Sequence, residues 1–219
     1  MKRKWKLWMI AFVVFVMTDI MMQSNRAEAK KRTFTVSSKT IPCSSSYRQK
    51  PYYNKKTKQY YMINSYMRRL STTGGTLKLK KGTYKIPGTI YVPSNVKIVC
   101  ANGVKIKKTK ATGTKKVKST KFLFQMISEE KASGKQNTGK YAASKNASIQ
   151  GNGKVIFDMG NVNGATAVFV GHASGITVSG VRFRNKKGGS YIWIEGSKNI
   201  SVRQCVFERK KDVSGLKNR

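Results

Sequence analysis

From residue 75 onward, apolar and polar residues alternate in short runs. Leu77 and Leu79 occupy every second position of the first run, and Tyr84 and Ile86 do the same in the next. A period of two is typical of strands with one buried face, because successive side chains point to opposite sides. Turn-forming residues separate the runs, at Gly82, Pro87-Gly88, Pro93-Ser94-Asn95 and Asn102-Gly103. The pattern therefore predicts many short strands joined by tight turns.

One apolar pattern occurs twice, at an offset of 24 residues. The two copies read GITVSGVRF (residues 175–183) and NISVRQCVF (residues 199–207). Val178 and Phe183 of the first copy recur as Val202 and Phe207 of the second. The segments TAVFV (166–170) and SYIWI (190–194) precede the two copies at the same offset.

Each of these units supplies three short strands, as a coil of a parallel β-helix requires. In such a solenoid, equivalent strands stack about 4.8 Å apart, so inward positions keep apolar residues while outward positions vary. We therefore predict an all-β fold, a right-handed parallel β-helix with a short N-terminal capping α-helix.

The pattern also predicts the limits of the solenoid. Tyr60, Ile63, Met67 and Leu70 have helical spacing, which predicts an amphipathic helix over residues 58–70. The predicted regions are a signal peptide (1–29), an irregular lead-in (30–57), a β-helix of about four coils (58–209) and a polar tail (210–219). Two earlier segments share the repeat loosely, residues 95–106 and 146–157, so the stretch from 107 to 145 is expected to protrude as loops.

The first 29 residues have the features of an export signal. Basic residues precede an apolar run from Leu7 to Met17, and Ala27-Glu28-Ala29 matches a cleavage site. An uncleaved membrane anchor is the alternative, but it needs about 20 apolar residues. We expect cleavage near Ala29, no stable membrane span afterwards, and a secreted, extracellular or cell-wall location.

The charge is strongly positive, with 45 Lys and Arg against eight Asp and Glu. Removing residues 1–29 takes away five basic and two acidic residues, which leaves a net charge of +34. Such a chain attracts polyanions. For an exported protein we expect an anionic polysaccharide or cell-wall polymer as the partner, and no nucleic acid, since no nucleic-acid-binding motif is present. The alternative is a lysine-rich surface without a partner.

Residues 74–98, GGTLKLKKGTYKIPGTIYVPSNVKI, resemble the entry segment of the pectate lyase-like superfamily of right-handed β-helices. That superfamily includes polygalacturonases, pectate lyases and phage tailspike depolymerases, and its members cap the N-terminal end of the solenoid with a helix. The usual proline before Gly82 is lacking here, where the sequence reads Lys80-Lys81-Gly82-Thr83-Tyr84. The catalytic Asp, Gly-His-Gly and Arg-x-Lys motifs of polygalacturonases are also missing from the sequence.

The resemblance implies the N-terminal portion of a carbohydrate-active enzyme, a polysaccharide lyase or polygalacturonase-type glycosidase. The alternative is a non-enzymatic, highly basic protein that binds a cell surface or wall. No cofactor is expected, and Ca²⁺ only if the protein is lyase-like.

Few residues qualify for acid–base catalysis. Glycosidases need two carboxylates about 5 to 10 Å apart. The weak catalytic candidates are Asp158, Glu195, Glu208 and the single histidine, His172. For each, a structural role is the alternative: strand-end carboxylates paired with lysine, and a histidine in a glycine-flanked turn.

Candidate binding residues lie at outward positions of the last coils. The arginines Arg182, Arg184 and Arg203 suit carboxylate or sulfate groups. In SYIWI, alternation predicts that Ile192 and Ile194 point inward, with Tyr191 and Trp193 outward as a platform for stacking sugar rings. The alternative is that these aromatics pack under an external loop.

The odd number of cysteines, Cys43, Cys100 and Cys205, allows at most one disulfide. Cys205 replaces Val181 in the repeat, which predicts a small buried side chain. No metal site is predicted, because Cys and His lack the spacing of zinc ligands.

Overall fold

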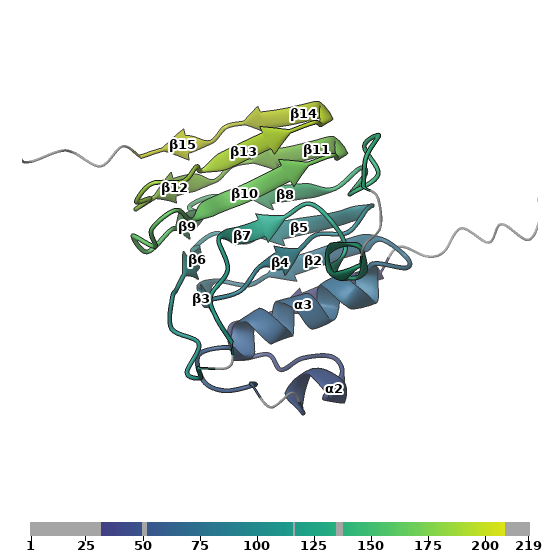
Figure 1. Ribbon diagram of the computed structural model, residues 1–219. Helices are drawn as coiled ribbons and strands as arrows, with labels where there is room; N and C mark the ends of the chain where they lie inside the picture. Colours follow the sequence, from purple (N-terminus) through teal and green to yellow (C-terminus); the bar gives the residue numbers. More distant parts are fainter. Residues whose placement is uncertain (1–31, 50–51, 116, 135–137, 209–219) are drawn as a thin grey trace, which may run out of the picture. The chain divides into compact units, whose positions relative to one another are not determined.

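The computed structural model describes residues 32–49, 52–115, 117–134 and 138–208. Within this part, strands form three sheets in which every paired strand is parallel to its neighbour. The chain passes from one sheet to the next and returns to the first one rung higher (Figure 1). The predicted parallel β-helix is confirmed. The predicted signal peptide (1–29) and tail (210–219) lie outside the described residues.

The three sheets take their strands in turn along the chain. Sheet A contains β1 (Arg32–Val36), β2 (Gly75–Leu79), β5 (Val96–Cys100), β8 (Ser148–Gly151), β11 (Ser174–Ser179) and β14 (Lys198–Arg203). Sheet B contains β3 (Gly82–Ile86), β6 (Val104–Lys108), β9 (Ile156–Asp158), β12 (Arg182–Arg184) and β15 (Val206–Phe207). Sheet C contains β4 (Ile90–Tyr91), β7 (Phe122–Gln125), β10 (Thr166–Gly171) and β13 (Ile192–Glu195). Four coils thus have all three strands, and β14 and β15 begin a fifth.

Inward residues stack in columns through the solenoid. In sheet A, the column is Leu77, Ile98, Ile149, Val178 and Val202. In sheet B, it is Tyr84, Ile106, Phe157, Phe183 and Phe207. The 24-residue repeat therefore has the predicted register, with Val178 paired to Val202 and Phe183 to Phe207. Each fully buried side chain of this kind stabilises the fold by about 1.5–3 kcal/mol.

One end of the solenoid is covered by α3 (Lys58–Leu70), which has the predicted limits (Figure 1). It packs on β2, β3 and β4 with its apolar side, including Met62, Ile63 and Leu70. At its end, Gly74 takes a positive φ of 64° and its N–H donates to the carbonyl oxygen of Leu70. A side chain at Gly74 would meet the carbonyl of Asn95 in the next coil, so the turn requires glycine.

The lead-in predicted to be irregular is instead partly regular. β1 pairs with β2 in register, which aligns Phe34 with Leu77 and Val36 with Leu79. The short helix α2 (Ser45–Arg48) follows, and Tyr47 packs against Tyr61 of α3. Five residues of alternating pattern were too few to reveal a strand without its partner.

The stretch from 107 to 145 contains a strand of the solenoid and is not only protruding loop. β7 completes the second coil between β4 and β10, and the short helix α4 (Glu129–Ser133) follows it. Insertions on both sides of β7 separate the aligned residues Lys97 and Ser148, which are 51 positions apart. This spacing hid the coil from a search for a constant period.

Lys108 occupies an inward position at the end of β6 and is fully buried. Its Nζ donates to the carbonyl oxygens of Pro87, Gly88 and Phe122 at 2.9–3.1 Å. The ammonium thus joins the β3–β4 turn to the start of β7, where the first insertion returns to the solenoid. Burial lowers the pKa of Lys108 to about 7.

All three cysteines are free thiols in the structure. Cys43 is exposed, Cys100 is buried, and burial raises the pKa of Cys100 to about 12. Cys205 packs against the core but is only half-buried, whereas its place in the repeat predicted a buried side chain.

No helix among the described residues has the length and apolar character needed to span a membrane.

Candidate functional site

Lysine and arginine side chains on the outer face of sheet B stand in two columns. One column runs Thr83, Lys105, Ile156, Arg182 and Val206, and the other runs Lys85, Lys107, Asp158 and Arg184. These positions alternate with the inward column of aromatic and aliphatic residues, so the side chains point away from the core. Rungs about 4.8 Å apart therefore present positive charge repeatedly along one face.

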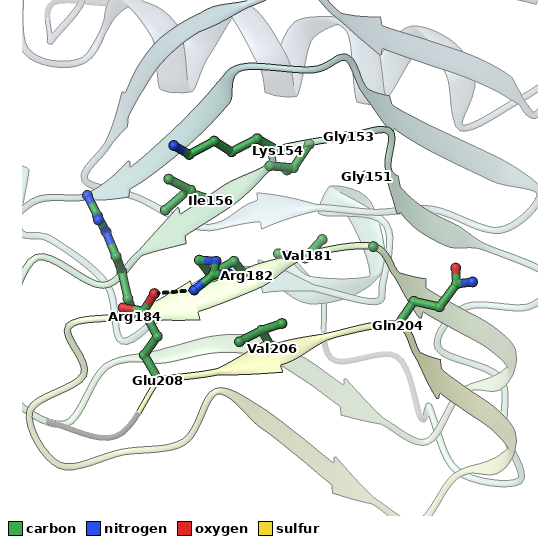
Figure 2. A pocket seen from close by; sticks show the side chains of 12 residues that line it. Gly151, Gly153, Lys154, Ile156, Val181, Arg182, Arg184, Gln204, Val206 and Glu208 are labelled. Carbon is green, nitrogen blue, oxygen red and sulfur yellow. Dashed lines mark hydrogen bonds and ion pairs between the residues drawn. The ribbon is translucent and has the colours of Figure 1, made fainter.

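A groove of about 730 Å³ lies beside these columns, at the corner where sheet A passes into sheet B. It is lined by Gly151, Gly153, Lys154, Val155, Ile156, Gly180, Val181, Arg182, Arg184, Gln204, Val206 and Glu208. Figure 2 shows Arg182 between Ile156 and Val206, with Lys154 and Gln204 on opposite sides of the groove. The groove thus combines an apolar strip with cations.

Glycines form the corner itself. A Cβ atom on Gly151 would overlap the carbonyl oxygen of Gly180, and one on Gly180 would overlap that of Gly151. Gly180 also has a positive φ of 67°. Larger residues at these two positions would push the neighbouring coils apart.

Asp158 is the centre of an ionic network on this face. The side chain is buried, and its Oδ2 lies 3.1 Å from Lys105 Nζ and 3.3 Å from Arg184 Nη2. Its Oδ1 accepts hydrogen bonds from Asn185 Nδ2 at 2.9 Å and from the N–H of Gly160 at 3.0 Å. Burial alone would raise the pKa of Asp158, but the hydrogen bonds and the charge of Lys105 outweigh it and hold that pKa below its usual value. Asp158 is therefore an anion at neutral pH.

Glu208 is also paired. Its Oε1 lies 3.0 Å from Nη1 of Arg182 (Figure 2), and its main-chain oxygen accepts a hydrogen bond from the Tyr191 hydroxyl at 2.6 Å. The N–H of Glu208 donates to the carbonyl oxygen of Phe183, which places Glu208 above Arg184 in the second column.

The other two catalytic candidates lie elsewhere. Glu195 ends β13 and His172 follows β10, so both are at the corner between sheets C and A. Their contact is through the main chain, because the N–H of His172 donates to the carbonyl oxygen of Glu195. His172 has a positive φ of 51° and is exposed. The structure therefore places the four candidates at two corners, with Asp158 and Glu208 on one and His172 and Glu195 on the other.

The five predicted binding residues are distributed over the molecule. Arg182 and Arg184 line the groove, whereas Arg203 is exposed on the outer face of sheet A. Trp193 is 46% exposed on the outer face of sheet C. Ile192 and Ile194 share the inward side of Val168 and Val170, as predicted.

The outward orientation predicted for Tyr191 was wrong. Its side chain is buried in the core, with its ring centroid 5.7 Å from that of Phe183 and 6.0 Å from that of Phe207. Alternation applies within a strand, but β13 begins at Ile192, so Tyr191 belongs to the preceding corner.

An aromatic cluster that we did not predict surrounds Trp193. Phe122 and Phe169 stack with centroids 4.6 Å apart, and Trp193 lies 5.2 Å from Phe169 at an angle of 65°. The repeat could have predicted the place of Phe169, because Phe169 lies 24 positions before Trp193 and pairs with it. No sequence spacing indicated Phe122, because an irregular insertion precedes it. Lys154 and Gln204 of the groove were missed for a similar reason, since both belong to turns.

Among the described residues, no group of three or more His, Cys, Asp or Glu side chains is arranged to hold a metal ion.

We compared the sequence and the fold with those of known proteins. No family model and no curated protein matches the sequence. One solved structure shares the architecture. It is the crystal structure of PfbA, a surface adhesin of Streptococcus pneumoniae, with a TM-score of 0.52 and 16% sequence identity. The match covers 83% of this chain but 40% of the PfbA chain, so this chain spans less than half the length of that structure. At this identity the likeness shows the fold alone.

Proposed function

We propose that the protein is a non-enzymatic binding protein of the cell surface or wall. Its ligand is an acidic polysaccharide or a comparable anionic wall polymer, held in the groove and along the outer face of sheet B. The observation that supports this most directly is the groove itself, in which Lys154, Arg182 and Arg184 border an apolar strip.

The cations suit a polymer with repeated acidic groups. Arg182 and Lys105 stand in one column with Ile156 between them, and Arg184 and Lys107 stand in the other with Asp158 between them. Because the coils repeat at a fixed rise, the two cations of each column stand two rungs apart, roughly 10 Å, and acidic units of a linear polymer at that spacing can meet both. The planar guanidinium groups bind carboxylates with two parallel hydrogen bonds, which favours carboxylate over neutral sugars.

The apolar strip supplies the other half of a sugar-binding surface. Ile156 and Val206 lie between the charged side chains, and Val206 is 45% exposed. The C–H face of a pyranose ring can pack on such a strip while its acidic group reaches an arginine. Sites of this composition, apolar with a few placed polar groups, are usual for small ligands and sugar units.

The carboxylates favour binding over catalysis. Asp158 and Glu208 lie two rungs apart in one column, roughly 10 Å by the strand spacing, but each is paired with an arginine. A glycosidase needs a carboxylic acid that holds a proton, and its pKa is usually raised. The pKa of Asp158 is lowered instead.

The location is supported by the predicted export signal and by PfbA, which is a surface adhesin. The resemblance to the pectate lyase-like superfamily, and the enzyme activity it implies, stay predictions.

The experiment is a binding titration with polygalacturonate, a linear polyuronate, and with neutral dextran as the comparison polymer. The test variant is Lys154→Ala with Arg182→Ala, both in the groove. The matched control is Lys78→Ala with Lys97→Ala, two exposed lysines on the outer face of sheet A that remove the same charge. We expect roughly tenfold weaker binding for the groove variant and a much smaller loss for the control.

Equal losses in both variants would show that overall charge, and not the groove, attracts the polymer. Release of unsaturated uronate products during incubation would overturn the non-enzymatic function.

A further inference from the structure

Charge is distributed unevenly along the chain. Residues 30–128 contain 24 lysines and arginines and no aspartate or glutamate. The first acidic residues after this stretch, Glu129 and Glu130 of α4, contact Tyr47 and Arg68. Arg68 belongs to the last turn of α3, roughly 15 Å along the helix from its first residue, Lys58. The beginning of α3 therefore belongs to a stretch whose charged residues are all positive.

Two segments with exposed lysines meet at the beginning of α3. One is the turn that leads into the helix, and the other is the insertion between β6 and β7. Asn54 joins them, because its Nδ2 donates to the carbonyl oxygen of Thr112 at 2.9 Å. Figure 1 shows the insertion extending from β6 to the beginning of α3. The exposed lysines of the two segments, which we call the lysine patch, are Lys55, Lys56 and Lys58 in the first and Lys110, Lys115 and Lys118 in the second.

Neutral hydrogen bonds fix both segments. Asn54 Oδ1 accepts a hydrogen bond from the N–H of Lys56 at 2.8 Å. In the insertion, Thr112 Oγ1 lies 2.8 Å from the carbonyl oxygen of Thr114 and 2.6 Å from that of Val117. The ion pairs found among the described residues all lie elsewhere. Like charges are thus held close together by groups that do not neutralise them.

The placement of these lysines does not serve stability. Acidic side chains are favoured at the N-terminal end of a helix, and positive charge there opposes the helix dipole. The first turn of α3 has no acidic residue and begins with Lys58. Repulsion between the two segments adds to this cost, and a bound anion would offset both. Residues that weaken the fold at their own positions are expected at functional sites.

We propose that the lysine patch is a second polyanion site, separate from the groove, and that its ligand is a linear polymer of phosphodiester units. The two segments, residues 52–58 and 109–121, contain no arginine. A lysine ammonium is a compact charge that meets a phosphate oxygen from many directions, whereas the flat carboxylate is matched by guanidinium groups such as those in the groove. None of the exposed large apolar side chains of the described residues lies in these segments. The patch therefore favours a charged polymer over a sugar ring or insertion into a membrane.

Binding of poly(glycerol phosphate) to the full chain tests the site. One variant replaces the three lysines of the first segment by Gln, and a second variant replaces the three lysines of the insertion. Each should bind roughly tenfold more weakly. The slope of log K against log salt should also become shallower by roughly 2, because each phosphate contact of a single strand contributes about 0.7. The matched control, which should lose much less, removes three exposed charges on or next to sheet A with Lys78→Gln, Lys97→Gln and Lys145→Gln.

Two further measurements separate a binding role from a structural one. Without polymer and at low salt, both patch variants should unfold at the same temperature as the wild type or higher, because repulsion is removed. Asn54→Ala keeps every charge but loses the hydrogen bond to Thr112, so it should weaken binding and reduce the salt dependence. Circular dichroism checks that each variant is folded. Lower unfolding temperatures in both patch variants, or unchanged binding by Asn54→Ala, would overturn the proposal.

Three other outcomes would also overturn it. Equal losses in the patch variants and the control would show that net charge alone attracts the polymer. Binding to phosphatidylglycerol vesicles but not to poly(glycerol phosphate) would identify a lipid surface as the ligand. A loss of poly(glycerol phosphate) binding in the groove variant, Lys154→Ala with Arg182→Ala, as large as in the patch variants would place this polymer in the groove. The function proposed for the groove is tested separately, with polygalacturonate.

Discussion

At the scale of single residues, the alternation between inward and outward positions decides most roles, and the corners provide the exceptions. Asp158 shows a third case, an outward residue that is nevertheless buried by its partners. It engages Lys105 and Arg184, two cations that would otherwise be available to a ligand. Asp158 therefore competes with an external carboxylate for these cations.

Replacing Asp158 by Asn tests this competition. We expect tighter binding of polygalacturonate and a steeper dependence on salt, because Lys105 and Arg184 become free to bind anions. The free energy of unfolding should fall by about 1–2 kcal/mol, since both cations are partly exposed and water replaces much of the lost interaction. Titration and urea unfolding of the same samples measure the two effects. Weaker binding together with lower stability would mean that Asp158 only maintains the shape of the face.

Lys108 gives a prediction on pH. Its pKa is lowered from 10.5 to about 7 by burial, so between these values the unfolded chain binds a proton that the folded protein lacks. Stability should therefore rise with pH from about 7 to about 10, by up to roughly 1.4 kcal/mol per pH unit. Lys108→Met should lose this rise, and it should be less stable because three buried carbonyl oxygens lose their donor. Unfolding curves of both proteins across this range measure the difference. If the stability of both proteins changed with pH in the same way, the rise could not be due to Lys108.

The sequence predicted individual residues well where a strand repeats in register and poorly where it does not. Val178, Phe183 and Ile194 have the predicted orientation because their partners lie at a constant offset. Tyr191 was misplaced because a corner residue has no alternation. The pairing of Asp158 depends on Lys105, which is separated from it by both insertions, and no local pattern reveals such a contact.

At the scale of elements, the helix α3 was predicted with its limits because a 3.6-residue period over thirteen residues is unambiguous. β1 and β7 were missed because short strands are recognisable mainly through their neighbours. Their neighbours, β2 for β1 and β4 and β10 for β7, are distant in sequence. A helix or strand could therefore be predicted where its own residues carry the pattern, as in α3, and not where the pattern depends on distant partner strands.

The cover formed by α3 should contribute strongly to stability. Ile63→Ala removes a buried side chain at the end of the solenoid, and we expect a loss of about 2–4 kcal/mol in the free energy of unfolding. Arg69→Ala, on the exposed side of the same helix, is the control and should change stability by less than about 0.5 kcal/mol. Chemical unfolding measures both. Similar values for the two variants would show that the helix does not seal the core.

At the scale of the whole molecule, composition indicated a polyanion partner, but only the fold places its cations in columns. The lysines are scattered along the sequence. Lys105 and Arg182 come to lie in one column of sheet B because the coils stack in register although they differ in length. The corner that the groove follows requires Gly151 and Gly180, which lie against each other in neighbouring coils. Neither residue stands out in the sequence from the other glycines.

The stacking of the coils has a mechanical consequence. Each coil contacts only the coils beside it, and β15 joins the solenoid through two residue pairs. If the protein were stretched along the solenoid while attached to a surface, the force would fall on one interface at a time. The coils would separate one after another and dissipate work step by step.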